Sequence, residues 1–324
     1  MNAHPTDRYD VAVIGGGAAG LNGALMLVRS RRRVLVIDAG QPRNAPAEGV
    51  HGLLGRDGMA PAELLALGRD EVRRYGGEVL DAEVVAAERD GTDFLVTLAG
   101  GRTLRARRLL VTTGVIDVLP EVTGLAERWG RDVVHCPYCH GWEVRDRAIG
   151  VLASSERALH QALLFRQLSG DVIMFADGVT FSADQREELA AAGIGLVEAT
   201  VSGLEISDDR LSGVRLTDGT VVERTVLAVQ TGMTARADLL AGVGLRAVEH
   251  PMGIGSYVPA DAAGRTDVPG IWVAGNVADP MAQVGASAAA GAMAGAVINA
   301  DLVTEDLRTA VADRRAQELA EVSS

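Results

Sequence analysis

The sequence predicts an α/β fold with two nucleotide-binding-type domains, one of them discontinuous in the chain. Three observations support this. A glycine-rich turn joins two apolar strands at the N-terminus, a second strand–turn–helix segment lies near residue 150, and a further apolar strand lies near residue 270. The 324 residues are enough for two domains of ordinary size. We therefore expect two Rossmann-like three-layer domains, the second inserted into the first.

The first element is a βαβ unit at the N-terminus. Residues 10–14 (DVAVI) form a short apolar β run, and GGGAAG follows at residues 15–20. An apolar helical stretch then occupies residues 21–28, and a second strand at residues 33–37 ends at Asp38. A G-x-G-x-x-G turn between a strand and a helix, followed by an acidic residue after the next strand, is the dinucleotide-binding fingerprint.

Each residue type in this motif has a physical role. Gly15 permits the tight turn, Gly17 lets the backbone approach a pyrophosphate, and Gly20 lets the helix pack closely on the strand. The helix N-terminus presents N–H groups and a partial positive charge to the phosphates. Asp38 lies about 20 residues further on, where a carboxylate accepts hydrogen bonds from ribose hydroxyls.

Two later segments indicate FAD rather than NAD as the dinucleotide. Residues 109–114 (LLVTTG) form a buried strand that ends in a Thr-Gly turn, and residues 270–276 (GIWVAGN) form another apolar strand with a turn. A helix begins near Gln283. A helix N-terminus directed at the pyrimidine edge of a flavin would stabilise the negative charge of the reduced ring.

Composition excludes several other classes of function. The formal charge of −12 and the pI of about 5.0 argue against a nucleic-acid partner, because phosphate binding needs a basic face. The N-terminus MNAHPTDRYD has no apolar signal region, so we expect a cytoplasmic protein. Residues 284–298 are mostly Ala and Gly. We expect them to form a closely packed helix, too short and too weakly apolar to span a membrane.

The stretch VHCPYCHGWE at residues 134–143 holds both cysteines of the chain, Cys136 and Cys139. A CxxCH motif is compatible with haem attachment, a metal site or redox chemistry. Haem attachment generally requires export, for which there is no signal. Zinc needs about four ligands, and His135 and His140 are too close in sequence to the cysteines to converge with them on one ion. Redox chemistry is the remaining interpretation, and no metal is expected.

Taken together, these motifs resemble the low-molecular-weight thioredoxin reductases, FAD-containing pyridine-nucleotide-disulfide oxidoreductases. The resemblance covers nearly the full length, from GGGAAG through CxxC to VPGIWVAGNV at residues 268–277. It implies a homodimer, an FAD domain at residues 1–117 and 237–324, and a degenerate pyridine-nucleotide-type domain at residues 118–236 that carries the CxxC. It also implies FAD contacts at Gly15, Gly17, Ala18, Ala19, Gly20, Asp38, Ala39, Gly40, Asn44, His51, Val84, Thr113, Gly114, Gly275, Asn276, Gln283 and Val284.

One of these positions departs from the family pattern. Asn276 replaces the usual Asp of the C-terminal turn. An amide can still form hydrogen bonds to the ribityl chain of the flavin, so we expect FAD binding to survive the replacement.

The second nucleotide motif is degenerate. Where the family has G-x-G-x-x-A, this chain has Ala153, Ser155 and Ala158, so side chains stand where a pyrophosphate should approach the backbone. The next strand, residues 171–175, is followed by Asp177, and the basic cluster that would bind the 2′-phosphate of NADPH is absent. We therefore expect that NADPH does not reduce the flavin.

Without NADPH, electrons must enter through the thiols. A dithiol substrate would reduce the Cys136–Cys139 disulfide, the resulting dithiol would reduce FAD, and the reduced flavin needs an acceptor, of which O₂ is the simplest. This scheme resembles the FAD-dependent dithiol oxidases of natural-product pathways, of the gliotoxin and holomycin type. The string CPYCHGWE is similar to theirs, whereas thioredoxin reductases typically place Asp after the second Cys.

The expected function is oxidation of a small-molecule dithiol to an intramolecular disulfide, with O₂ reduced to H₂O₂. Cys136 is the interchange thiol that meets substrate, and Cys139, by resemblance, passes electrons to the flavin. His140 replaces the acid of the reductases; it deprotonates a thiol or stabilises the Cys139 thiolate, or only forms hydrogen bonds to the loop. His135 faces solvent or the core, or transfers a proton.

Three alternatives stay open. The protein could be an NADPH-dependent thioredoxin reductase, or a non-enzymatic redox switch that binds a partner through its flavin and disulfide. A ferredoxin donor is a third route for electrons, which nothing in the sequence excludes.

Overall fold

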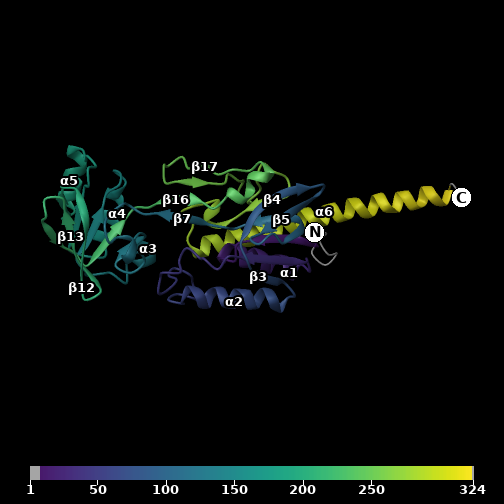
Figure 1. Cartoon of the computed structure of the whole chain (residues 1–324), viewed down its shortest axis with the longest axis horizontal. Coiled ribbons are helices and arrows are strands. Elements are labelled where there is room, and N and C mark those ends of the chain that lie inside the picture. Colours follow the sequence, from purple (N-terminus) through teal and green to yellow (C-terminus); the bar gives the residue numbers. More distant parts are fainter. Residues whose placement is uncertain (1–7, 323–324) are drawn as a thin grey trace. The chain divides into compact units, whose positions relative to one another are not determined.

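The computed structural model describes residues 8–322, and the chain divides into two compact units (Figure 1). Unit 1 consists of Met1–Arg43, Ala62–Ile116 and Met233–Ser324, and unit 2 consists of Asn44–Pro61 and Asp117–Gly232. The chain passes between the units through two short strands, β7 (Val115–Val118) and β16 (Gly232–Ala235), which pair with each other.

These units differ chiefly in one segment from the boundaries expected from the sequence. Residues 44–61, expected in the FAD domain, group with the CxxC-bearing unit 2. The remaining boundaries, expected at residues 117 and 237, fall at Ile116 and Met233. Residues 1–7, which begin the N-terminal segment used to expect a cytoplasmic protein, lie outside the described residues.

A seven-stranded sheet forms the centre of unit 1. Six strands follow the order β3-β2-β1-β6-β5-β4, and β19 pairs with the carboxyl end of β6. Strands β3, β2, β1, β6 and β19 are parallel, and β4 and β5 form an antiparallel hairpin. The strands are β1 (Arg8–Ile14), β2 (Val34–Asp38), β3 (Glu78–Asp81), β4 (Val84–Asp90), β5 (Asp93–Leu98), β6 (Thr103–Val111) and β19 (Ile271–Val273).

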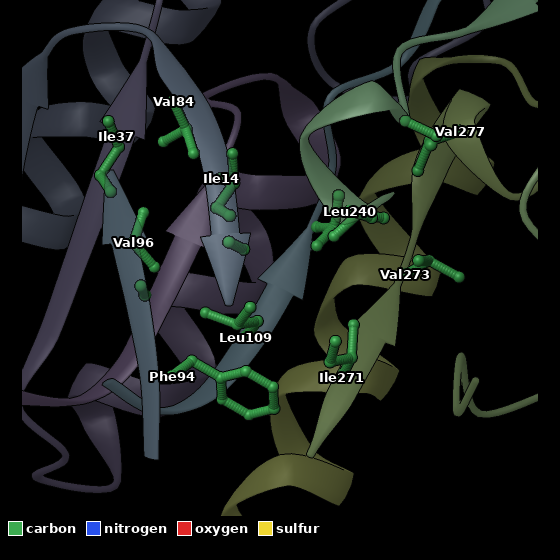
Figure 2. Close-up of a cluster of buried hydrophobic side chains, with 14 of the residues drawn as sticks. Ile14, Ile37, Val84, Phe94, Val96, Leu109, Leu240, Ile271, Val273 and Val277 are labelled. Carbon is green, nitrogen blue, oxygen red and sulfur yellow. The ribbon is translucent and has the colours of Figure 1, made fainter. Parts of the chain in front are cut away.

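The sheet of unit 1 is buried on both faces, which explains why its central strands are continuously apolar. Alternate residues of β1 enter different cores: Val11 and Val13 pack beneath the helices, whereas Ala12 and Ile14 face the β4–β5 hairpin. Figure 2 shows the second of these clusters, in which side chains from β1, β2, β4, β5, β6 and β19 lie together with Leu240 and Val277. This arrangement gives the three layers expected from the sequence.

The helices of unit 1 are α1 (Ala18–Arg29), α2 (Pro61–Arg74) and α6 (Val284–Val322), with 3₁₀ turns η3 (Asp238–Val243) and η4 (Gly275–Val277). A two-residue pair, β17 (Val248–Glu249) and β18 (Ser256–Tyr257), completes the unit. Helices α1 and α6 make the most extensive contact between any two elements. They approach so closely that a Cβ at Gly291 would collide with the carbonyl oxygen of Ala19.

The close packing expected for residues 284–298 is therefore present. The expectation that this segment is too short and too weakly apolar for a membrane concerned residues 284–298 alone. The longer helix α6 has, by length and composition, a window apolar enough to cross a bilayer. Core helices of soluble proteins share that property, and the first half of α6 packs against α1. Residues 306–321, in the second half of α6, are exposed (Figure 1).

Unit 2 is a second three-layer structure. Its sheet is parallel throughout, in the order β11-β10-β9-β15-β8, and helices cover one face while a three-stranded antiparallel sheet covers the other. The parallel strands are β8 (Val133–Val134), β9 (Ile149–Leu152), β10 (Val172–Phe175), β11 (Gly195–Val197) and β15 (Val226–Val229). The other elements are α3 (Pro137–His140), α4 (Ala158–Arg166), α5 (Ala183–Ala191), η2 (Ala126–Arg128), β12 (Val201–Ser207), β13 (Arg210–Leu216) and β14 (Val221–Glu223).

A buried ion pair holds the entry to β8, the short strand before the CxxC motif. Arg128 donates to both carboxylate oxygens of Asp132 at 2.8 and 2.5 Å, and the Leu211 N–H donates to Asp132 at 2.9 Å. Burial favours the protonated acid, but these hydrogen bonds outweigh it and lower the pKa of Asp132. Asp132, the residue before β8, is therefore held both by Arg128 and by the backbone of β13.

The α1–α6 contact gives a first prediction. Ala is a better helix former than Gly, so G291A would stabilise an isolated helix. In this protein the added methyl group meets the backbone of α1. We expect G291A to lower the free energy of unfolding by about 2 kcal/mol, as overpacking typically does. Chemical denaturation measures the change, and A296L, at an exposed position of the same helix, is the control expected to be neutral.

Candidate active site

The first glycine turn has the geometry that its sequence predicts. Gly15 adopts a φ of +106°, which side chains other than glycine rarely tolerate. A Cβ at Gly20 would collide with the carbonyl oxygen of Gly15, so α1 packs directly on the turn. Thr112 closes the turn from the neighbouring strand, its hydroxyl donating to the carbonyl oxygen of Gly15 at 2.8 Å.

The start of α1 is open toward its phosphate-binding side. Gly17 is the N-cap of α1 and has no side-chain cap, and no atom lies within 4 Å of the position of its Cβ. The N–H groups of the first helical turn, which includes Ala18 and Ala19, have no partners within the helix. This open cradle fits the pyrophosphate of a dinucleotide.

The predicted dinucleotide contacts lie on one edge of the sheet. Strands β2, β1, β6 and β19 are parallel and in register, so their carboxyl ends meet. Gly15, Asp38, Thr113 and Gly275 each follow or end one of these strands. The Thr113 hydroxyl donates to the carbonyl oxygen of Arg236 at 2.7 Å. Ligands of open α/β sheets bind at such an edge.

Asp38 has an ionic partner that the sequence did not reveal. Arg69 on α2 donates to Asp38 Oδ2 at 2.7 Å. The Asp38 carboxylate also lies close to the glycine turn, since a Cβ at Gly16 would stand 2.7 Å from its Cγ. This position is suitable for the ribose, with Arg69 orienting the carboxylate.

Asn276, the departure from the family pattern, has a structural explanation. Its Nδ2 amide donates to the carbonyl oxygens of Asp279 at 3.1 Å, Pro280 at 3.2 Å and Ala282 at 2.8 Å. A carboxylate in its place could only accept hydrogen bonds and would face three acceptors. Asn276 thus shapes the loop that leads into α6.

The remaining predicted contacts are distributed unevenly. Ala39 and Gly40 follow β2, and Gln283 and Val284 stand where α6 begins. Val84 lies in the apolar core of unit 1, with only 8% of its surface exposed. Asn44 and His51 belong to unit 2, the unit that carries the CxxC motif. No local sequence pattern indicates this grouping.

The residues of unit 1 therefore fit FAD. Gly15, Gly17 and Gly20 form the cradle for its pyrophosphate, Asp38 is placed for a ribose, and the N-terminus of α6 supplies a partial positive charge.

The CxxC motif forms one short helical turn after β8. Cys136 is the N-cap of α3, and its carbonyl oxygen accepts the N–H groups of Cys139 at 3.2 Å and His140 at 3.0 Å. Both cysteines are partly exposed. Gly141 ends the turn, where a Cβ would collide with Leu168. The geometry holds the two thiols one helical turn apart, as disulfide exchange requires.

Tyr138 and Trp142, which flank this turn, point outward, with 69% and 66% of their surfaces exposed. The guanidinium of Arg145 lies 4.1 Å from the Trp142 ring centroid. An exposed aromatic pair beside reactive thiols offers an apolar surface to a small substrate.

His135 is anchored to the protein. Its Nδ1 lies 2.9 Å from the carbonyl oxygen of Val229, which can only accept, so Nδ1 carries the hydrogen. Gln161 on α4 donates to the carbonyl oxygens of His135 at 2.7 Å and Val229 at 3.3 Å. His135 thus ties the CxxC segment to β15, a structural role that accounts for its position.

His140 has a different environment. Burial lowers its pKa from the usual 6.5, and the neighbouring charge of His51 acts in the same direction. The carboxylates of Glu143 and Glu48 oppose the shift. Its imidazole is therefore neutral at pH 7 and available as a base.

The acidic residues near the CxxC turn were not among the residues predicted from the sequence. Glu143 is three residues after His140 in the quoted stretch, a spacing that could have drawn attention to it. Glu48 and Asp57 lie in the loop 44–61, and no local pattern connects that loop to the CxxC. Within residues 8–322, no cluster of three or more His, Cys, Asp or Glu side chains is arranged to hold a metal ion.

The turn after β9 differs from the turn after β1. Three residues, 15–17, separate β1 from α1, whereas five residues, 153–157, separate β9 from α4. Ala153 does not adopt a positive φ. The hydroxyls of Ser154 and Ser155 both donate to Gln230 Oε1 at 3.1 Å. The side chains of Ser154 and Ser155 therefore occupy this turn and are hydrogen-bonded to the side chain of Gln230.

The Asn276 contacts give a second prediction. N276D should lose all three hydrogen bonds and lower the free energy of unfolding by about 1–3 kcal/mol, with faster loss of flavin. N299D is the matched control: Asn299 accepts from Arg32 Nε at 2.7 Å, a bond that a carboxylate preserves. Thermal unfolding and flavin absorbance after dilution distinguish the two. Equal behaviour of both variants would contradict the assignment.

Known proteins with similar sequences belong to a family of redox enzymes. A family model described as pyridine nucleotide-disulphide oxidoreductase matches residues 9–295. The thioredoxin reductase sirT of Leptosphaeria maculans is 32% identical over 317 residues, covering 92% of this chain and 96% of the relative. The thioredoxin reductase tcpT of Claviceps purpurea is 34% identical over 251 residues, covering 73% and 77%.

Solved structures agree with the fold over its length. The crystal structure of HlmI is 45% identical, with a TM-score of 0.90, and the match covers 96% of this chain and 98% of HlmI. An oxidoreductase from Agrobacterium tumefaciens is 37% identical, with a TM-score of 0.86, and covers 92% and 99%. The glycine cradle, the parallel strand edge and the CxxC turn thus occur on a shared scaffold, and the chain belongs to the pyridine nucleotide-disulphide oxidoreductase family as a thioredoxin reductase-like, FAD-dependent enzyme.

Proposed function

We propose that this enzyme oxidises a small-molecule dithiol to an intramolecular disulfide, with molecular oxygen as the final acceptor and hydrogen peroxide as the second product. The turn at residues 153–157 is the main support, because a pyridine nucleotide needs a backbone free of side chains at this place. Here Ser154 and Ser155 are bonded to Gln230. The similarity of the CxxC segment to the dithiol oxidases of natural-product pathways points the same way.

The acidic residue after β10 adds a second argument. Asp177 accepts the N–H of Val201 at 2.8 Å, so its carboxylate is held in place at the end of the strand. A fixed negative charge there opposes a 2′-phosphate, the group that distinguishes NADPH.

Sulfur chemistry then supplies the electrons. One thiolate of the substrate attacks Cys136 Sγ, the Cys136–Cys139 bond breaks, and Cys139 leaves as a thiolate. The second substrate thiolate attacks the substrate sulfur of this mixed disulfide, which closes the product ring and releases Cys136. FAD, which the glycine cradle and Asp38 of unit 1 would hold, would supply the acceptor for the two electrons of the Cys136–Cys139 dithiol. His140, next to Cys139, accepts a proton during the exchange.

The remaining features of the proposal come from the family resemblance. We propose that two chains form a homodimer and that the enzyme acts in the cytoplasm. An NADPH-dependent disulfide reductase is the second candidate, favoured by relatives that are named thioredoxin reductases.

The two candidates differ in what bleaches the flavin. In the absence of oxygen, we expect dithiothreitol to reduce the enzyme-bound FAD and a similar concentration of NADPH to leave it oxidised. Readmission of oxygen should restore the flavin absorbance and produce about one H₂O₂ per dithiol consumed. Rapid bleaching by NADPH alone would reverse the assignment.

Replacement of the cysteines tests their separate roles. C139S should abolish flavin reduction. Its remaining thiol, Cys136, should attack the disulfide of an oxidised monothiol probe and keep one half as a mixed disulfide, while the other half leaves as a thiol. C136S should form no such adduct. Mass spectrometry of both variants after incubation with an oxidised monothiol probe distinguishes them, and an adduct on Cys139 in C136S alone would exchange the two roles.

A further inference from the structure

Helix α2 carries an arginine on the face that packs against the rest of unit 1. Leu65, Arg69 and Val72 are spaced four and three residues apart, so they share one side of the helix. Leu65 and Val72 are buried in the same apolar cluster as residues of α1. Gly68 lets the two helices approach, because a Cβ there would stand 3.0 Å from Leu21 Cδ1. A charged side chain in this position needs polar partners.

The guanidinium of Arg69 is only partly satisfied by the protein. Its Nη2 donates to Asp38 Oδ2 at 2.7 Å, and the two side chains are 23% and 12% exposed. Its Nε is buried and has no hydrogen-bond partner in the part of the chain that the structure describes. A buried donor without a partner destabilises the fold, so a native protein keeps one where another molecule completes it. The Nε–H group of Arg69 is therefore available to a bound molecule.

This donor stands next to an acceptor. Nε and Nη2 lie on the same edge of the planar guanidinium, and that edge offers two parallel N–H groups. Within residues 8–322, the hydrogen bond from Arg69 Nη2 to Oδ2 is the only one that the Asp38 carboxylate accepts, so Oδ1 can still accept another. Asp38 ends β2. One N–H group and one carboxylate oxygen thus remain for a ligand at the end of this strand.

The two groups suit one part of FAD. The Asp38 carboxylate lies beside the glycine turn, since a Cβ at Gly16 would stand 2.7 Å from its Cγ, and this is the place of the adenosine ribose. Each ribose hydroxyl donates one hydrogen and accepts on its oxygen, so the diol satisfies a carboxylate and an N–H group together. A phosphate would accept from Arg69 but would be repelled by Asp38.

We propose that Arg69 binds FAD directly, donating from Nε to a hydroxyl oxygen of the adenosine ribose while the same diol donates to Asp38. Arg69 is then a cofactor-binding residue in its own right, in addition to orienting Asp38. The two side chains together select a ribose that keeps both hydroxyls. This inference concerns the cofactor alone and does not rest on the proposed dithiol oxidation.

Lysine at this position separates direct binding from orientation of Asp38. R69K keeps a positive charge that can pair with Asp38, but an ammonium lacks the fixed, parallel N–H groups of a guanidinium. If Arg69 only orients Asp38, lysine should replace it with little loss. If Arg69 binds the ribose, R69K should raise the dissociation constant of FAD about tenfold, as the loss of one good hydrogen bond does. Flavin fluorescence measures this constant while FAD is added to the full chain freed of flavin.

Cofactor analogues identify the group that Arg69 binds. FAD that contains 2′-deoxyadenosine or 3′-deoxyadenosine lacks one hydroxyl of the diol. The wild-type chain should bind at least one of these analogues about tenfold more weakly than FAD, because a donor or acceptor of the site loses its partner. In R69K this difference should shrink to about threefold, because Asp38 alone still contacts the diol.

Arg73 provides a matched control one turn further along α2. Its Nη1 pairs with Asp70 at 3.3 Å on the surface, and its side chain is 50% exposed. R73K should bind FAD and both analogues as the wild type does. Melting temperatures of the flavin-free chains show which variants are folded. R69Q, which removes the charge, should show the same smaller difference and replaces R69K if that variant does not fold.

Three results would reject the direct contact. If R69K binds FAD as tightly as the wild type, the Nε–H group serves only water. If the wild type binds FAD and both analogues equally, the diol is not recognised at this edge. If R69K binds FAD more weakly but keeps the full difference between FAD and the analogues, Arg69 acts only through the fold. None of these results bears on the thiol chemistry, which flavin reduction by dithiothreitol tests separately.

Discussion

The close approach of three backbone segments around the start of α1 is the constraint on which the FAD edge depends. The glycine turn lies under α1, α6 crosses against the carbonyl oxygen of Ala19, and a Cβ at Gly275 would stand 2.9 Å from Ala19 Cβ. Each contact exists because glycine leaves out a side chain. The carboxyl ends of the parallel strands, the start of α1 and the start of α6 thus meet in one place, where a phosphate and a flavin both find partial positive charge.

In unit 2, side chains stand where the corresponding turn of unit 1 has glycine, so the backbone there is not open to a phosphate. Its parallel sheet has the same strand–turn–helix connection, but Ala153 and Ser155 stand where glycine does in unit 1. The longer turn is closed by the hydroxyls of Ser154 and Ser155 on Gln230. The fold of the domain survives because strand pairing and core packing do not depend on those glycines. What remains is a scaffold that places β8, and the CxxC after it, beside β15.

Charge placement around the thiols follows a different logic from that around the dinucleotide. At the FAD edge, Arg69 forms an ion pair with Asp38 at 2.7 Å and orients its carboxylate. Around the CxxC turn, burial lowers the pKa of the partly buried His140, and the charges of Glu143 and Glu48 oppose that shift. The first environment suits binding and the second suits proton movement.

The sequence by itself determined both three-layer domains, the glycine cradle, Asp38 at the end of its strand, the CxxC pair and the degenerate second turn. These features are local: strand periodicity, glycine spacing and adjacent cysteines are properties of short segments. Only the tertiary structure decided that residues 44–61 group with the CxxC unit, that Asn276 donates to three carbonyl oxygens, that Arg69 pairs with Asp38 and that His51 faces Glu143. Those relations join residues far apart in the chain or depend on the direction of one side chain. Packing of the whole domain sets them, and no local pattern records them.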